Sequence, residues 1–173
     1  NGSRKIIFSD PLSAEGDPVE NLINQNVLSS LRLSQLVAKR MIKQSEGSSE
    51  GTAGAIISLS SISAQRTHPQ LLAHSMATAA LDQMTRTLGL ALAPHRIRVN
   101  AVAFGSVMSA SLKEQLKDNP EYKSEIEAHT PLGRIASPNE LAEAVHFLAS
   151  DASSFMTGQI MTLDGGRTLL DPV

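Results

Sequence analysis

Short apolar runs alternate with long amphipathic segments along the sequence, and this alternation constrains the fold more than any other feature. Four apolar runs bounded by turn residues predict buried strands, at residues 5–9, 55–60, 97–103 and 159–163. Apolar residues at helical spacing predict three long helices, at residues 17–44, 70–93 and 138–150. Strands that alternate with helices are typical of a parallel sheet with right-handed crossovers. The sequence therefore predicts an α/β fold with a parallel sheet.

The first two long helices carry more apolar residues than one face of a sheet can cover. The first helix is expected to bury one face, which carries Leu22, Val27, Leu31, Leu33, Leu36, Val37 and Met41. In the second helix the stacked apolar residues are Met76, Ala80, Met84 and Leu88. Residues 17–44 and 70–93 therefore predict a symmetric interface between copies of the chain. The polar segment at residues 108–129 is expected to be mobile.

Composition favours one domain and excludes several kinds of partner. The chain has 173 residues, of which 41% are hydrophobic, and this is enough for a single core. Its formal charge of -2 is spread along the chain, so neither nucleic acid nor an anionic membrane is an expected partner. There is no cysteine, no apolar run of spanning length and no secretory signal, which predicts a cytoplasmic protein.

A set of short motifs occurs in an order typical of one known family. Ser61 lies thirteen residues before His74, and the later motifs include Asn-Ala-Val-Ala-Phe-Gly at residues 100–105 and Pro-Leu-Gly-Arg at residues 131–134. Phe-Leu-Ala-Ser-Asp at residues 147–151, Thr-Gly-Gln at residues 157–159 and Asp-Gly-Gly at residues 164–166 follow. In this order the motifs resemble the short-chain dehydrogenase/reductase family. The resemblance implies the later half of a Rossmann-like fold, which is a doubly wound parallel sheet in a three-layer α/β/α arrangement. It also implies oxidoreductase chemistry with NAD or NADP.

The family's reaction centre is only partly present in this sequence. In the family a serine and a tyrosine contact the reacting oxygen, and a lysine four residues after the tyrosine lowers its pKa and holds the nicotinamide ribose. By resemblance Ser61 matches the serine, whereas His74 replaces the tyrosine and Thr78 replaces the lysine. Asn26 matches the helix asparagine that holds a water in the proton relay. For Asn26 and Ser61, ordinary helix-surface and strand-end roles remain open alternatives.

Gly105 and Ser109 are the candidate cofactor contacts. The resemblance places them in the loop that reaches the nicotinamide carboxamide, although Phe104 replaces the usual proline and Ser109 replaces a threonine. A plain loop serine is the alternative for Ser109. The histidines show no metal-ligand spacing with carboxylates, so no metal site is predicted.

The family's glycine-rich dinucleotide turn has no counterpart in this sequence. We therefore interpret residues 1–173 as a single partial Rossmann-like domain that lacks the N-terminal fingerprint half, with weak or no binding of NAD or NADP. The first functional hypothesis is a catalytically impaired family member that acts as a structural or assembly subunit, as a homo-oligomer (dimer or tetramer). The alternative is an active oxidoreductase whose cofactor-binding part lies upstream and whose His74 is the acid or base. The small-molecule substrate is open, since a 3-oxoacyl, sugar or steroid alcohol would fit equally.

Overall fold

Three parallel strands form the sheet of this protein, for which a computed structural model describes residues 9–12, 18–66 and 68–170. Their order in the sheet follows the chain: β1 (Gly54–Ser61), β2 (Ile97–Phe104) and β3 (Ile160–Leu163). β1 pairs with all of β2, starting with Gly54 opposite Ile97, and β3 pairs with the second half of β2, starting with Ala101 opposite Ile160. The predicted parallel sheet is confirmed. Residues 5–8 of the first predicted strand lie outside the described residues, and Ser9 is not in a strand.

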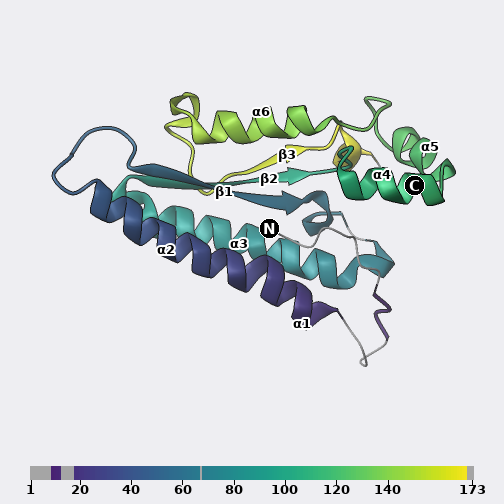
Figure 1. Ribbon diagram of the computed structural model, residues 1–173, viewed down its shortest axis with the longest axis horizontal. Helices are drawn as coiled ribbons and strands as arrows, with labels where there is room; N and C mark the ends of the chain where they lie inside the picture. Colours follow the sequence, from purple (N-terminus) through teal and green to yellow (C-terminus); the bar gives the residue numbers. More distant parts are fainter. Residues whose placement is uncertain (1–8, 13–17, 67, 171–173) are drawn as a thin grey trace.

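Helices cover both faces of this sheet, as Figure 1 shows. On one face lie α1 (Val19–Leu22), a π-helical turn (Ile23–Leu28) and α2 (Ser29–Gln44), which are continuous, together with α3 (Leu72–Leu92). On the other face lies α6 (Pro138–Ala149). Short 3-10 turns flank α3, at Pro69–Leu71 and Ala93–His95. The predicted three-layer α/β/α arrangement and its three long helices are confirmed.

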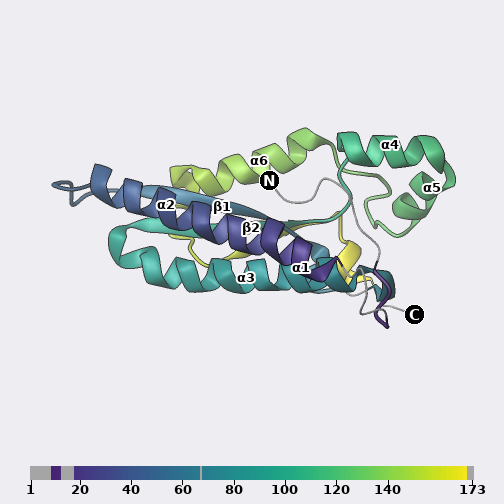
Figure 2. The same cartoon turned by 60° about the horizontal axis from the view of Figure 1, so that its bottom comes forward.

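The polar segment at residues 108–129 contains two helices that the sequence did not predict. α4 (Ala110–Asp118) and α5 (Glu121–Ala128) lie at the end of the sheet where the strands terminate (Figures 1 and 2). They are stabilised by a buried cluster of Leu112, Ile126 and Ile135, against which Tyr122 packs. Ile135 lies beyond the segment itself, so the burial that orders these two helices depends partly on a residue outside the polar stretch.

Two further apolar clusters hold the long helices against each other and against the sheet. Leu22 on α1 packs against Ala73 and Ala77 on α3, where small residues allow the helices to approach closely. Ala38 on α2 packs against Ile97 and Val99 of β2, and these form the second cluster. Its partly buried members are Met41, Ile42, Ala53, Ile56, Leu88 and Leu92. Leu88 was expected in an interface between copies, but it contributes to the core of the domain.

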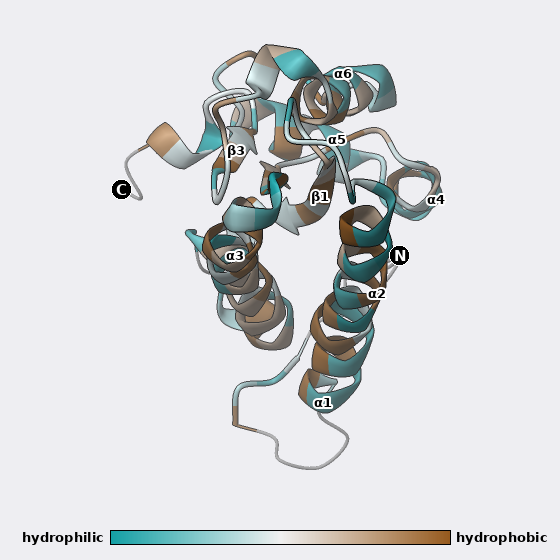
Figure 3. Ribbon diagram, turned by 90° about the vertical axis from the view of Figure 1, so that its left-hand side faces the viewer, coloured by the Kyte–Doolittle hydropathy of each residue, from teal (hydrophilic) through white to brown (hydrophobic). Residues whose placement is uncertain are grey.

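The apolar face predicted for the first helix is too broad. Leu33 and Leu36 are 62% and 67% exposed, whereas Leu22 on the preceding turns is buried. Figure 3 shows hydrophobic residues on several sides of the α1–α2 helix rather than on one stripe. The apolar repeat therefore predicted the helix correctly, but it does not specify which of its apolar residues face the core.

Buried polar side chains connect β2 to the segments before β3. Asn100 donates from its side-chain amide to the carbonyl of Met156 (2.8 Å) and accepts from the backbone N–H of Gln159 (2.9 Å). Arg98, only 6% exposed, donates to the carbonyl of Leu148 (2.9 Å) at the end of α6. These contacts fix α6 and the approach to β3 on the central strand.

The beginning of α6 is capped in full. Ser137 and Glu140 form a capping box, with Pro138 in the first turn. Arg134 holds both oxygens of the Glu140 carboxylate (2.8 and 2.7 Å), which lowers the pKa of Glu140 to about 2. This explains why the proline and glutamate of the sequence predicted the start of this helix correctly.

Candidate functional site

The candidate site lies where β1 and β2 end, at the carboxyl edge of the sheet. Ser61 closes β1 and pairs with Phe104, the last residue of β2. The 3-10 turn Ile62–Ala64 follows Ser61 and packs on α3, the helix that carries His74 and Thr78. In open parallel sheets this edge is where ligands bind.

The Ser61 hydroxyl is already engaged by its own turn. It lies 2.6 Å from the hydroxyl of Ser63 and accepts a hydrogen bond from the Ser63 backbone N–H (3.2 Å). Ser61 thereby caps the short 3-10 turn, as expected from the strand-end alternative. A ligand oxygen at Ser61 would have to share or replace the contact with Ser63.

His74 lies in the first turn of α3 and is partly buried. Burial lowers the pKa of its imidazole below the ordinary value of 6.5. The ring is therefore neutral near pH 7, where it can accept a proton more readily than it can donate one. No cation supports it from one helical turn further on, because that position is Thr78.

Thr78 cannot stand in for a lysine in this arrangement. It is 4% exposed, and its hydroxyl donates to the carbonyl of His74 (2.9 Å) and lies 3.2 Å from that of Ser75. This back-bonding into the preceding turn is the usual behaviour of a helical threonine. The position supplies no positive charge, and its single hydroxyl proton is used inside the helix.

Asn26 lies in the π-helical turn Ile23–Leu28 and is buried. It follows Leu22 by four residues, and Leu22 packs against Ala73 and Ala77 on either side of His74. The structure therefore places Asn26 on the helix that packs against the His74 segment. The π-helical turn itself was not predicted, and such turns are frequent at functional sites.

Gly105 and Ser109 have structural roles that the packing explains. A Cβ atom on Gly105 would lie 3.1 Å from Cβ of Asp164 and 3.5 Å from Cδ1 of Ile62, so a glycine lets the ends of the three strands approach closely. Ser109 is the N-cap of α4 and accepts from the backbone N–H of Leu112 (3.2 Å). Ser109 is thus a helix cap, a role that neither sequence interpretation included.

Ser9 and Asp10 lie beside the start of α3, and the sequence did not predict this contact between distant segments. The Ser9 backbone N–H donates to the carbonyl of Gln70 (2.9 Å), and its buried hydroxyl accepts from the backbone N–H of Ala73 (3.4 Å). Ser9, Asp10, Pro11, Pro69 and Gln70 line an open hollow there. A long-range cap of this kind has no local signal, because Ser9 and Ala73 are far apart in the sequence.

A buried acid on α3 was also missed. Asp82 is 3% exposed and Ser60 on β1 is 2% exposed, and neither Asp82 Oδ1 nor Ser60 Oγ has a hydrogen-bond partner among the described residues. Burial raises the pKa of Asp82, and the nearby Ser60 hydroxyl and the charge of Arg86 offset this only in part. Asp82 lies one helical turn beyond Thr78, so the buried face of α3 carries an acid near the place where the family has a cation.

The described residues include neither a metal site nor a membrane-spanning helix. Within residues 9–12, 18–66 and 68–170, no group of histidine, aspartate and glutamate side chains could hold a metal ion. The helices in the same ranges include none that is long and apolar enough to cross a bilayer.

Comparison with known proteins places the chain in a family. A family model described as Enoyl-(Acyl carrier protein) reductase matches residues 4–168. The chain belongs to the short-chain dehydrogenase/reductase family. The resemblance that the motifs indicated is therefore confirmed, and with it the α/β fold with a parallel sheet. The correspondence of Asn26, Ser61, His74 and Thr78 to the family's catalytic residues stays a prediction.

Relatives with known activities cover most of this chain. The 7alpha-hydroxysteroid dehydrogenase of Escherichia coli (strain K12) is 33% identical over 141 residues, which are 82% of this chain and 52% of that enzyme. The 3-oxoacyl-(acyl-carrier-protein) reductase FabG of Thermotoga maritima is 37% identical over 151 residues, which are 86% of this chain and 56% of that enzyme. A solved gluconate 5-dehydrogenase of Burkholderia cenocepacia, in complex with NADP and tartrate, has a TM-score of 0.82 and 28% identity. The alignment covers 97% of this chain and 64% of that one.

This chain spans about half the length of the curated relatives it matches. The covered share is 37% for a tropinone reductase homologue of Arabidopsis thaliana and 52% and 56% for the two enzymes above. This chain shares its fold and its family with these relatives, whereas similarity over part of a relative's length does not show that this chain has the relative's activity.

Proposed function

We propose that this short-chain dehydrogenase/reductase chain does not catalyse hydride transfer and acts as a structural or assembly subunit. The observation that carries the proposal is the hydrogen bonding of the buried Thr78 side chain. Its hydroxyl is bonded to the carbonyls of its own helix, so the position offers neither the charge nor the reach of a lysine. Catalytic groups of this kind act as a unit, and the loss of one removes most of the effect of the others.

The other site residues support the same conclusion. The Ser61 hydroxyl caps its own turn, and the neutral His74 ring lacks a neighbouring cation that would assist proton transfer. The described residues also fit NAD or NADP poorly, since none of them forms a glycine-rich turn that leads into a helix N-terminus. Weak or no cofactor binding by this chain follows from these features.

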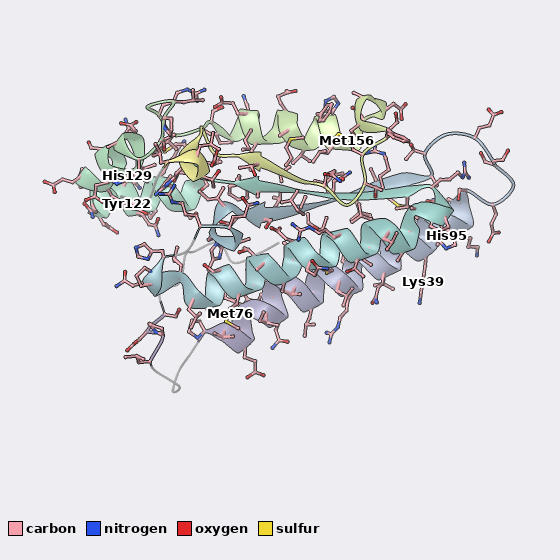
Figure 4. The ribbon with its side chains drawn as sticks, turned by 180° about the vertical axis from the view of Figure 1, so that it is seen from behind. Lys39, Met76, His95, Tyr122, His129 and Met156 are labelled. Atoms are coloured by element: carbon pink, nitrogen blue, oxygen red, sulfur yellow. The ribbon has the colours of Figure 1, made fainter. Side chains whose placement is uncertain are left out.

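Exposed apolar residues on the long helices support self-association. Leu33 and Leu36 on α2 are 62% and 67% exposed, and Met76 on α3 is 46% exposed. Figure 4 shows Met76 on the side of α3 that faces away from the sheet. Apolar side chains of this kind along two adjacent helices are typical of an interface between copies, here a dimer or tetramer.

Light scattering on purified chain tests the assembly function. We expect the parent chain to be a dimer or tetramer and Leu36→Asp to shift it to a smaller particle, because a buried unpaired carboxylate opposes association. The matched control is Leu132→Asp, which alters an equally exposed leucine (68%) in the loop before α6. A monomeric parent chain, or equal effects of the two substitutions, would contradict this function.

One observation favours a second candidate, an active oxidoreductase. Because burial lowers the pKa of His74, the neutral imidazole can accept the proton of an alcohol near pH 7. In that case residues upstream of this sequence would complete the cofactor site, and the chemistry would favour alcohol oxidation over carbonyl reduction. The intact mass of the natural protein and its upstream coding sequence discriminate the two, since a glycine-rich turn upstream would favour the enzyme.

A further inference from the structure

Two arginines lie together at the carboxyl edge of the sheet. Nη1 of Arg66 donates to the backbone carbonyls of Arg167 (2.5 Å) and Leu170 (2.9 Å). The side chain of Arg167 in turn donates to the hydroxyl of Ser106 (3.0 Å). The contact of Arg66 with the Arg167 carbonyl links the two residues, which we call the Arg66–Arg167 pair.

Neither member of this pair has an anionic partner in the described part of the chain. The ion pairs found there involve Lys117, Lys123 and Arg134 only. Asp164, three residues before Arg167, accepts from the backbone N–H groups of Gly166 (2.9 Å) and Thr168 (2.7 Å). Each carboxylate oxygen thus accepts one backbone N–H, so Asp164 stabilises its own turn.

Arg134 provides a contrast within the same protein. It binds both oxygens of Glu140, at 2.8 and 2.7 Å, which is the planar two-point contact that guanidinium groups favour. Within the described ranges, the Arg66–Arg167 pair makes only single-nitrogen contacts to neutral acceptors. Nε and Nη2 of both residues donate to none of the described residues, so these residues leave the two-point geometry available on each.

The pair also lies at the ligand-binding edge of the sheet. The Arg66 backbone N–H donates to the carbonyl of Ile62 (2.8 Å), the residue after Ser61. Ser106, which holds Arg167, follows Gly105 at the end of β2. In Figures 1 and 2 the turn after β3 lies at the same end of the sheet as α4 and α5. Arg66 and Arg167 thus connect the ends of all three strands around the candidate site.

We propose that Arg66 and Arg167 form a binding site for the oxyanion of a small molecule, a carboxylate or a phosphate group. The free edges of two guanidinium groups present several N–H donors and no acceptor, which suits a planar or tetrahedral oxyanion and excludes a cation. The site orients a negatively charged ligand against Ser61 and the end of β2. This inference goes beyond the assembly function, because it requires neither hydride transfer nor self-association.

A titration of the isotope-labelled chain, followed by amide chemical shifts, tests the proposal. The probes are glycerate, inorganic phosphate and glycerol, the last being the uncharged analogue of glycerate. We expect saturable shifts with glycerate, with phosphate or with both, and none with glycerol. Saturation with glycerate alone identifies a carboxylate site, and saturation with phosphate alone identifies a phosphate site. No saturation with either anion, or equal binding of glycerol, overturns the proposal.

Substitution of Arg167 locates the site without disturbing the turn. In Arg167→Gln the backbone carbonyl that Arg66 contacts is retained, so the fold of the turn is preserved. We expect at least a tenfold loss of affinity for the bound anion, whereas Arg40→Gln, the same charge change on an exposed residue of α2, leaves affinity unchanged. Equal affinities of Arg167→Gln and the parent chain would overturn the assignment, as would equal losses in the two variants. These readouts do not depend on particle size or activity.

Discussion

Replacing the buried Arg98 of β2 by methionine tests how α6 is held on the sheet. Arg98 donates to the carbonyl of Leu148 (2.9 Å), the hydroxyl of Ser153 (2.8 Å) and the carbonyl of Ser150 (3.1 Å). Methionine keeps most of the apolar stem and removes the charge with all three contacts. The contacts lie at the C-terminus of α6, where a cation also interacts favourably with the helix dipole.

The expected loss of stability follows from these contacts. A hydrogen bond to a charged group contributes about 1.5–3 kcal/mol, but the carbonyls of Leu148 and Ser150 both lie within reach of the Ser153 hydroxyl, whose single proton can bond one of them at a time. We therefore take about 1 kcal/mol for each of the three. Nε of Arg98 has no described hydrogen-bond partner, so removal of this buried charge offsets roughly 1 kcal/mol of that loss. The net prediction is a loss of about 2 kcal/mol in the free energy of unfolding.

Arg96→Met is the matched control for this experiment. Arg96 also donates to backbone carbonyls, including those of Ser48 and Gly51, but these contacts are exposed and water can replace them. We expect a loss below about 0.5 kcal/mol for this variant. Urea unfolding at one pH, with the slope compared between variants, measures both. Equal losses, or a more stable Arg98→Met, would refute the reasoning, the latter because apolar replacement of a buried charge can stabilise a protein.

Three further predictions concern α3. Since burial lowers the pKa of His74 below 6.5, its imidazole binds a proton more readily in the unfolded chain than in the folded one. The free energy of unfolding should therefore fall as pH drops below about 6.5, and unfolding curves of His74→Gln should show a smaller decrease over the same pH range. Asp82→Asn should stabilise the protein by about 1 kcal/mol at pH 7, an advantage that shrinks as pH falls toward 3.8; no gain over Asp118→Asn, an exposed control, would contradict it. The double variant His74→Tyr with Thr78→Lys should show no hydride transfer in a nicotinamide absorbance assay, because the nucleotide turn is absent from residues 1–173; measurable turnover would mean a more complete cofactor site.

The sequence predicted most of the helices and strands because their apolar patterns are local. The run at residues 55–60 became β1 (Gly54–Ser61), and the repeat at residues 70–93 became α3 (Leu72–Leu92). α4 and α5 were missed because their few buried residues depend on Ile135, which lies outside the segment. Leu33 and Leu36 were placed on the buried face because a periodic pattern does not state which side a neighbour covers.

The sequence placed Ser61 at the end of a strand and His74 near the start of a long helix, and both residues lie there in the structure. Their catalytic correspondence stays a prediction. The strand-end alternative anticipated the bond of the Ser61 hydroxyl within its own turn, whereas the bonding of Thr78 into its own helix depends on side-chain orientation, which spacing does not determine. The buried Asp82 escaped notice because a lone acid in a helix is usually exposed.

Titration of the 173-residue chain with NADPH and NADH, followed by nicotinamide fluorescence, tests the central claim most directly. The account predicts very weak or no binding of either nucleotide, because Thr78 supplies no cation at the ribose and no described turn holds the pyrophosphate. The gluconate 5-dehydrogenase of Burkholderia cenocepacia, which was solved in complex with NADP, serves as the positive control for the assay. Micromolar affinity of the 173-residue chain for either nucleotide would contradict the account and favour an oxidoreductase that uses His74.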